Sequence, residues 1–154
     1  MPYVYPTSVR KSSVYLPDTA MLDLGDFAGG LLRYLKRHPV ERLTIGGGFA
    51  KLAKLGAGEL DLHSKRSQVD FGWLAGRVAD AGGDAELVAA ARSANTALQV
   101  LQSAAGAGLP VGDAVADAAR ATALAVLDGA PVAVDVVVVD REGAVVGASP
   151  AVQT

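Results

Sequence analysis

Cations and glycines crowd one stretch of the chain, residues 42–68, which reads RLTIGGGFAKLAKLGAGELDLHSKRSQ. Three consecutive glycines precede Lys51 and Lys54, and His63 follows nine residues after the second lysine. Glycine lets a ligand approach backbone N–H groups closely, and fixed cations bind anionic groups. The stretch therefore suits the binding of an anionic small molecule.

The same residues also have a purely structural interpretation. Gly46, Gly47 and Gly48 would then form only a tight turn, and Lys51 and Lys54 would lie on a solvated helix face. The P-loop pattern is absent, and Lys51 stands where the dinucleotide fingerprint needs its third glycine or alanine. From spacing alone, both a ligand-binding loop and a plain turn remain open.

Metal and covalent chemistry are not expected. The chain has no cysteine, and His38 and His63 are its only histidines. A dedicated transition-metal site is therefore improbable on composition, and a disulfide framework is impossible. A lone exposed histidine is usually a surface residue, and no spacing supports a triad of nucleophile, base and orienting group.

The net charge of −2 conceals an asymmetry between the two parts of the chain. Residues 1–66 hold ten Lys or Arg and six Asp or Glu, whereas residues 67–154 hold four and ten. A nucleic-acid partner is not expected, because the whole chain is acidic and only 5% aromatic. No apolar run reaches the length of a membrane span, so we expect a cytoplasmic protein without a membrane partner.

Two strand–turn–helix units are expected to position the cationic stretch. Apolar runs at 20–25 and 42–46 each end in glycine and lead into helical spacing at 26–39 and 49–58. Parallel neighbours need a crossover, so the carboxyl ends of both strands should meet at one edge, where ligands bind. The turn at 23–26 and the glycine run would then lie side by side.

The second half of the chain is expected to be mostly helical, with Ser67 as the first N-cap. A strongly apolar strand at 131–140 is expected in the sheet interior, with 144–149 as its hairpin partner at the edge. The predicted fold class is α/β, Rossmann-like and three-layered, with a mostly parallel, mixed sheet of about four to five strands and helices on both faces. The alanine-rich helices are predicted at 67–82, 84–108 and 110–129.

Joined blocks of the sequence resemble one enzyme family. The segments LDLGDFAGG, GGGFAKLAKL and HSKR are similar to the C-terminal domain of CbiD, the cobalt-precorrin-5B C(1)-methyltransferase of cobalamin biosynthesis. The likeness continues through ANTAL, GDAVADAARATALAVL and PVAVDVVVVDREG. It divides the chain into a divergent segment, 1–15, and an α/β domain, 16–154.

The resemblance implies an S-adenosylmethionine-dependent enzyme that methylates a ring carbon, C1, of a cobalt-bearing tetrapyrrole on the anaerobic route. Cobalt would arrive with the substrate, so no protein-bound metal is implied. The cosubstrate would be bound at the two turns, and the substrate carboxylates would be bound by nearby polar and cationic side chains. His63 is the candidate base. The implied cosubstrate residues are Asp23, Gly25, Asp26, Gly46, Gly47 and Gly48, and the implied substrate residues are Lys51, Lys54, Ser64, Lys65 and Arg66.

The family's members are about twice this length and carry an N-terminal α+β domain. The chain is therefore expected to be a partial enzyme, completed by a separate N-terminal half or by homo-oligomer formation. The segment VYPTSVRKSS keeps Thr7 and Ser8 of a family turn but lacks its Gly-Arg pair and Glu, so one cofactor-side loop is expected to be altered. Two alternatives belong to other classes: a non-catalytic domain that binds cofactor or corrinoid, and a structural partner that has kept only the fold.

Overall fold

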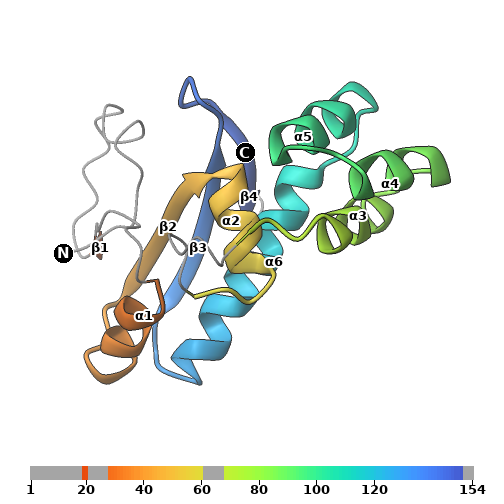
Figure 1. Ribbon diagram of the computed structural model, residues 1–154. Coiled ribbons are helices and arrows are strands. Elements are labelled where there is room, and N and C mark those ends of the chain that lie inside the picture. Colours follow the sequence, from red (N-terminus) through yellow and green to blue (C-terminus); the bar gives the residue numbers. More distant parts are fainter. Residues whose placement is uncertain (1–18, 21–27, 61–67, 151–154) are drawn as a thin grey trace.

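The chain forms a small α/β structure in which helices pack on a mixed sheet (Figure 1). The computed structural model describes residues 19–20, 28–60 and 68–150. The strands are β1 (Thr19–Ala20), β2 (Arg42–Gly48), β3 (Ala133–Val139) and β4 (Val145–Ser149). The helices are α1 (Ala28–Arg37), α2 (Phe49–Gly56), α3 (Phe71–Asp80), α4 (Ala85–Arg92), α5 (Ala97–Gly106) and α6 (Val111–Leu127).

The sheet has the strand order β1-β2-β3-β4. β2 is parallel to both of its neighbours, and β4 pairs antiparallel with β3 at the edge. The mixed sheet, the interior place of β3 and the hairpin to β4 confirm the prediction from sequence. β1 contributes only two residues, so three strands form the body of the described sheet instead of the four or five expected.

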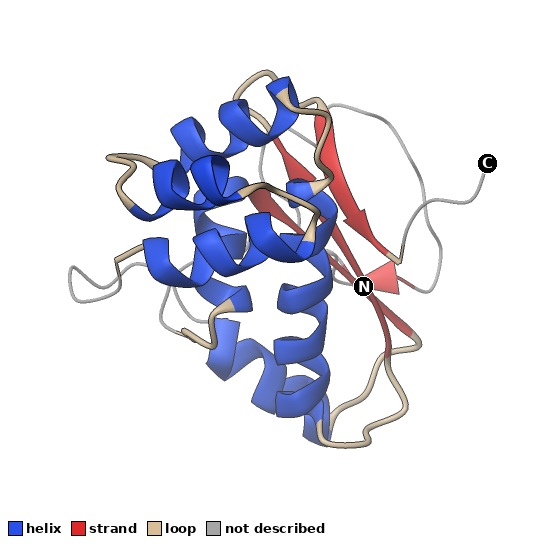
Figure 2. Cartoon of the chain, turned by 90° about the vertical axis from the view of Figure 1, so that its right-hand side faces the viewer, coloured by secondary structure: helices blue, strands red, loops and turns tan. Residues whose placement is uncertain are grey.

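The described helices lie on one side of the sheet (Figure 2). β1, β2 and β3 follow one another across the sheet in the same order as in the sequence. Because connections between parallel strands are right-handed, each connection in this order places its helices on the same face of the sheet. Helices on both faces require a reversal of strand order, which these strands lack. The second helical layer that we predicted is thus not found among the described residues.

Small side chains let α6 approach the sheet closely. Val115, Ala116, Ala119 and Ala123 are completely buried on α6. The first turn of α6 meets β4 through a hydrogen bond, in which the backbone N–H of Ala148 donates to Asp113 Oδ1 at 2.9 Å. The alanine content that the sequence shows thus allows close helix-to-sheet packing.

A polar pair interrupts the otherwise apolar centre of the sheet. Asp135 stands in a run of valines on β3, directly across from Thr44 on β2. The Thr44 hydroxyl donates to Asp135 Oδ1 at 2.7 Å, and Thr44 is 4% exposed. Because a buried polar group without a partner is costly, this bond explains how an aspartate is tolerated in the central strand.

The single helix predicted at 84–108 is in fact two helices. α4 ends at Arg92 and α5 begins at Ala97, where Thr96 and Gln99 form a capping box. The Gln99 N–H donates to Thr96 Oγ1 at 3.2 Å, and the Thr96 N–H donates to Gln99 Oε1 at 3.3 Å. The Thr-x-x-Gln pattern is a helix-start signal, and the continuous alanine periodicity concealed it.

Asp70 is the N-cap of α3, because its Oδ1 accepts the Trp73 N–H at 2.9 Å. The predicted cap, Ser67, lies outside the described residues. We expect Asp70→Ala to lower the free energy of unfolding by about 1 kcal/mol, measured by urea denaturation, because α3 loses a bonded N–H partner. Ser67→Ala is the comparison: if it lowers stability by that amount and Asp70→Ala does not, this capping assignment is wrong.

Candidate functional site

The three glycines lie in a strand and do not form a turn. β2 continues through them in register with Val137, Val138 and Val139 of β3, and α2 starts at the next residue. Gly48 has φ −70° and ψ 160°, an extended conformation open to any residue, and none of the three has a positive φ. Our prediction of a glycine turn is therefore wrong, and turn conformation does not explain glycine here.

Space provides another reason for glycine at position 48. A Cβ atom added to Gly48 would meet no heavy atom of the described residues within 4 Å. The backbone at the end of β2 therefore faces a volume that no described side chain occupies. Because glycine has no side chain, a ligand can come into direct contact with the backbone at this position.

The N-terminus of α2 opens at the same place. Gly48 offers no side-chain cap, and the first turn of α2 contains no acidic residue. The first N–H groups of a helix need partners, and together with the helix dipole they attract negative charge. α5 differs, because its capping box already binds N–H groups at its start. An anionic group of a ligand therefore suits the α2 end.

A cavity of about 640 Å³ lies at this carboxyl edge of the sheet. It is open to solvent on one side, and its lining comes from the end of β2, the first turn of α2, the first turns of α5 and the turn between β3 and β4. Figure 1 shows where these elements lie in the fold. Its volume falls within the roughly 300–1,000 Å³ usual for small-molecule sites. The lining residues are Gly48, Phe49, Ala50, Lys51, Thr96, Ala97, Leu98, Leu101, Gln102, Val139, Asp140, Arg141 and Glu142.

The lining combines an apolar wall with charged groups. Phe49, Leu101 and Val139 are almost fully buried and pack the wall, whereas Leu98 is 38% exposed. Lys51 and the residues of the β3–β4 turn add charges of both signs. A pocket of this kind suits a ligand that has an apolar body and charged ends.

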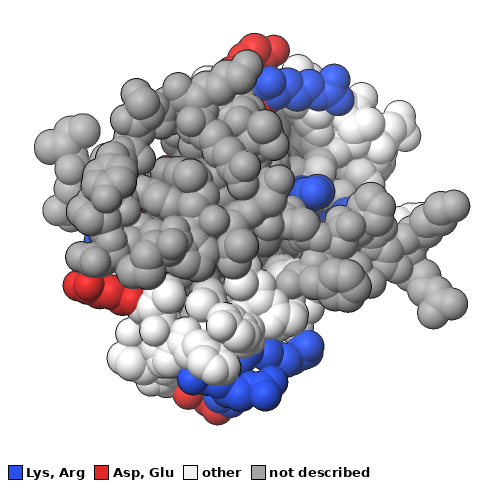
Figure 3. Space-filling view, turned by 90° about the vertical axis from the view of Figure 1, so that its left-hand side faces the viewer, with Lys and Arg blue, Asp and Glu red and all other residues white. Residues whose placement is uncertain are grey.

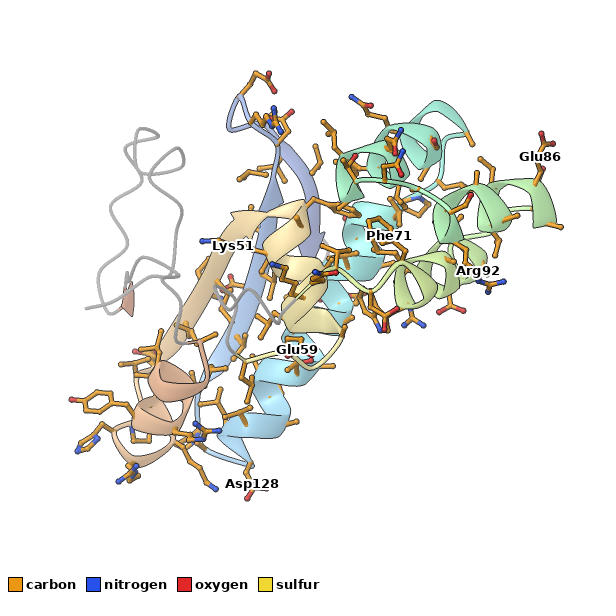
Figure 4. All side chains as sticks on the ribbon, viewed as in Figure 1. Lys51, Glu59, Phe71, Glu86, Arg92 and Asp128 are labelled. Carbon is orange, nitrogen blue, oxygen red and sulfur yellow. The ribbon has the colours of Figure 1, made fainter. Side chains whose placement is uncertain are left out.

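Lys51 and Lys54 have different positions on α2. Lys51 is exposed, lines the cavity and projects from the side of α2 that faces away from α3 and α4 (Figure 4). Lys54 is half-buried in the last turn and lies outside the cavity lining. The structure thus brings Lys51, but not Lys54, to the same hollow as Gly48.

Seven predicted site residues lie outside the described part of the chain. Gly46, Gly47 and Gly48 are described and end at the cavity edge, with Gly46 and Gly47 buried in β2. The residues outside are Asp23, Gly25, Asp26, His63, Ser64, Lys65 and Arg66.

A second group of basic side chains lies far from the cavity. Lys36 and Arg37 occupy the last turn of α1, near the amino end of β2, and Lys36 pairs with Asp128 at 3.3 Å. Figure 3 shows basic side chains at the upper and lower ends of one face, each group beside acidic ones, and further basic atoms between the two ends. The lower group is a solvated, partly paired helix end rather than part of the cavity.

His38 also belongs to the end away from the cavity. Its ring stacks on Tyr34 with centroids 4.4 Å apart, on the exposed surface of α1. Within the described residues, no group of three or more His, Cys, Asp or Glu side chains is placed to hold a metal ion. In the same part of the chain, no helix is long and apolar enough to cross a membrane.

Sequence reasoning missed the residues that α5 and the β3–β4 turn contribute. Leu98, Leu101 and Gln102 were hidden within a helix predicted to be continuous, and Asp140 was interpreted only as the last residue of the strand predicted at 131–140. One signal was available. The strand at 131–140 was predicted beside the parallel strands, so Asp140 at its end could have been assigned to the carboxyl edge of the sheet, where ligands bind.

Comparison with known proteins gives one consistent result. A family model described as "CbiD, C-terminal domain" matches residues 61–150. Proteins named cobalt-precorrin-5B C(1)-methyltransferase are similar: one from Bradyrhizobium sp. (strain BTAi1) is 60% identical over 86% of this chain and 35% of its own length. Those from Paramagnetospirillum magneticum and Rhodospirillum rubrum are each 58% identical, over 86% and 83% of this chain and 36% of their own lengths.

The chain therefore spans about a third of the length of the curated relatives that it matches. No solved structure matches it.

Proposed function

The chain belongs to the CbiD family, whose C-terminal domain model matches more than half of it, and on that premise we propose that it serves S-adenosylmethionine-dependent C-methylation of a cobalt-precorrin. The proposed reaction is methyl transfer to C1 of cobalt-precorrin-5B, which the relatives' name states for them, and we place this reaction in anaerobic cobalamin biosynthesis. We place it in the cytoplasm.

The cavity at the ends of β2 and β3 is the proposed cosubstrate site. Its apolar wall suits the adenosine part, and the uncapped α2 N-terminus suits the carboxylate of the methionine part. When bound, S-adenosylmethionine supplies a methyl group on an already activated sulfonium. The protein's contribution is then mainly positioning and the exclusion of water.

Each described residue has a separate proposed task. Gly48 leaves space for close approach, Leu101 and Val139 keep water from the wall, and Lys51 binds a carboxylate of the tetrapyrrole at the rim. The other predicted residues stay proposals: Gly46 and Gly47 with Asp23, Gly25 and Asp26 for the cosubstrate, Lys54, Ser64, Lys65 and Arg66 for substrate carboxylates, and His63 as the base.

The rest of the catalytic unit is proposed to come from a separate N-terminal half or from a second copy of the chain. The relatives' greater length supports this division, because two thirds of them have no counterpart among the matched residues. The larger Rossmann-like sheet that we expect would likewise need strands beyond the described ones.

The observation that carries the proposal is the cavity at the carboxyl edge of the sheet, beside a helix N-terminus whose N-cap residue, Gly48, has no side chain to bond its first N–H groups. We expect isothermal calorimetry to give saturable binding of S-adenosylhomocysteine to the chain, with a dissociation constant of about 1 µM to 1 mM. Absence of binding at millimolar ligand would contradict the proposal and favour a structural partner. Binding without methylation of cobalt-precorrin-5B, even with an N-terminal half supplied, would favour the non-catalytic binding domain.

Lys51→Gln tests the substrate side of the site. We expect the variant to bind a corrinoid with free carboxylates, cobyrinic acid, roughly 3- to 10-fold more weakly than the wild type, with a smaller salt dependence, since one exposed cation is lost. Fluorescence titration at two salt concentrations measures both effects. Lys36→Gln, which removes an exposed lysine at the far end, is the matched control, and an equal loss in both variants would refute a specific role for Lys51.

A further inference from the structure

Asp140 occupies a special position at the cavity. It directly follows Val139, the last residue of β3, and Val139 is the register partner of Gly48. Neighbouring strands lie about 4.8 Å apart, so the carboxylate-bearing residue after β3 stands beside the first turn of α2. Asp140 is half-buried and lines the cavity.

Backbone groups hold the Asp140 carboxylate in place. Its Oδ1 accepts the N–H groups of Glu142 and Ala144, both at 2.9 Å. The turn is closed by Asp140 N–H donating to the Ala144 carbonyl at 2.9 Å and by Gly143, whose φ of 85° favours glycine. The carboxylate is therefore pre-oriented, and ordering it on ligand binding requires little conformational entropy.

The second carboxylate oxygen, Oδ2, takes no part in the turn. Both turn bonds end on Oδ1, and among the described residues no hydrogen bond to Oδ2 is formed. A half-buried carboxylate oxygen at a cavity is a strong acceptor for a charged donor. Glu142 offers a carboxylate on the same turn, but it is exposed and its side chain has no bond of this kind among the described residues.

We infer that Asp140 binds the α-ammonium group of the cosubstrate's amino-acid end. This inference rests on the proposed function. The α-ammonium and the α-carboxylate of an amino acid share one carbon atom, so a zwitterion needs a negative and a positive group side by side. Asp140 and the N-terminal end of α2, on adjacent strand ends, provide that pair.

Asp140→Asn is the direct test. Asparagine keeps a carbonyl oxygen for the two turn N–H groups and replaces the second carboxylate oxygen by an amide NH₂, which repels a cationic donor. We expect about 10- to 100-fold weaker binding of S-adenosylhomocysteine by calorimetry. Binding of 5′-methylthioadenosine, which lacks the amino-acid end, should change less than twofold.

Glu86→Gln is the matched control, because it removes one negative charge from the exposed surface of α4, outside the cavity lining. It should leave the affinity for both ligands within about twofold. A loss with Glu86→Gln equal to that with Asp140→Asn would make the effect one of general charge and would overturn the inference. If Asp140→Asn does not fold, the test uses the wild type with two ligands. The wild type should bind deaminated S-adenosylhomocysteine, which lacks the α-ammonium group, at least tenfold more weakly than S-adenosylhomocysteine.

The possible outcomes separate the two proposals. If the wild type binds S-adenosylhomocysteine and Asp140→Asn binds it equally well, the role of Asp140 is refuted and the proposed function stands. If the wild type binds neither S-adenosylhomocysteine nor 5′-methylthioadenosine, the proposed function itself fails.

Discussion

Gly112→Ala is expected to destabilise the chain by about 3 kcal/mol or more. Gly112 in the first turn of α6 passes directly over Gly147 of β4, and a Cβ atom at position 112 would overlap the backbone carbonyl of Val146, lying 2.8 Å from its carbon. The obstructing atoms belong to the backbone of a strand, so they cannot move aside as a flexible side chain would. α6 would have to separate from the sheet, which disturbs the largest helix-to-sheet contact of the fold.

Urea denaturation monitored by circular dichroism measures this effect as a fall in midpoint with an unchanged slope. Gly76→Ala is the matched control: among the described residues, the added Cβ in the interior of α3 would meet no atom within 4 Å, so a gain of about 0.5–1 kcal/mol is expected. If Gly112→Ala is as stable as the wild type, the close crossing of α6 and β4 is wrong.

Gly48→Leu is expected to abolish cosubstrate binding while the chain stays folded. The backbone at position 48 accepts any side chain, and an added Cβ would meet no atom of the described part of the chain within 4 Å, so the free energy of unfolding should change by no more than about 1 kcal/mol. The leucine side chain would instead fill the cavity in front of α2. We expect at least a 100-fold loss of affinity for S-adenosylhomocysteine.

Gly48→Ala should give an intermediate loss, about tenfold, because one methyl group occupies less of the same space. Calorimetry on the folded variants measures both values, and Gly76→Ala serves again as the control, since it adds a methyl group on α3, which contributes no residue to the cavity lining. Wild-type affinity in Gly48→Leu would show that the ligand does not approach the end of β2.

Sequence patterns predicted the strand and helix order well. The apolar runs before residue 46 and after residue 131 became β2 and β3, and the predicted helix at 110–129 became α6. These predictions succeeded because burial in a parallel sheet or against a helix leaves a clear periodicity in the sequence. The resemblance to the CbiD family was confirmed by the family model and the relatives.

Features that depend on tertiary packing were not predictable in this way. The three glycines were predicted to form a turn because glycine is disfavoured in strands. In the structure they stay extended, because they pair with three valines of the neighbouring strand β3. The break before Thr96 was hidden by alanine periodicity on both sides of it. The cavity joins residues from four elements, and its α5 wall has no local sequence signal that marks it as part of a site.

A titration of the ¹⁵N-labelled chain with S-adenosylhomocysteine, followed by backbone amide chemical shifts, tests the proposed site most directly. The largest saturable shifts should occur at Gly48, Phe49 and Lys51 at the start of α2, at Leu98 on α5, and at Asp140. Saturable shifts confined to α4 or to the amino end of β2, with these five amides unmoved, would contradict a cosubstrate site at the carboxyl edge of the sheet.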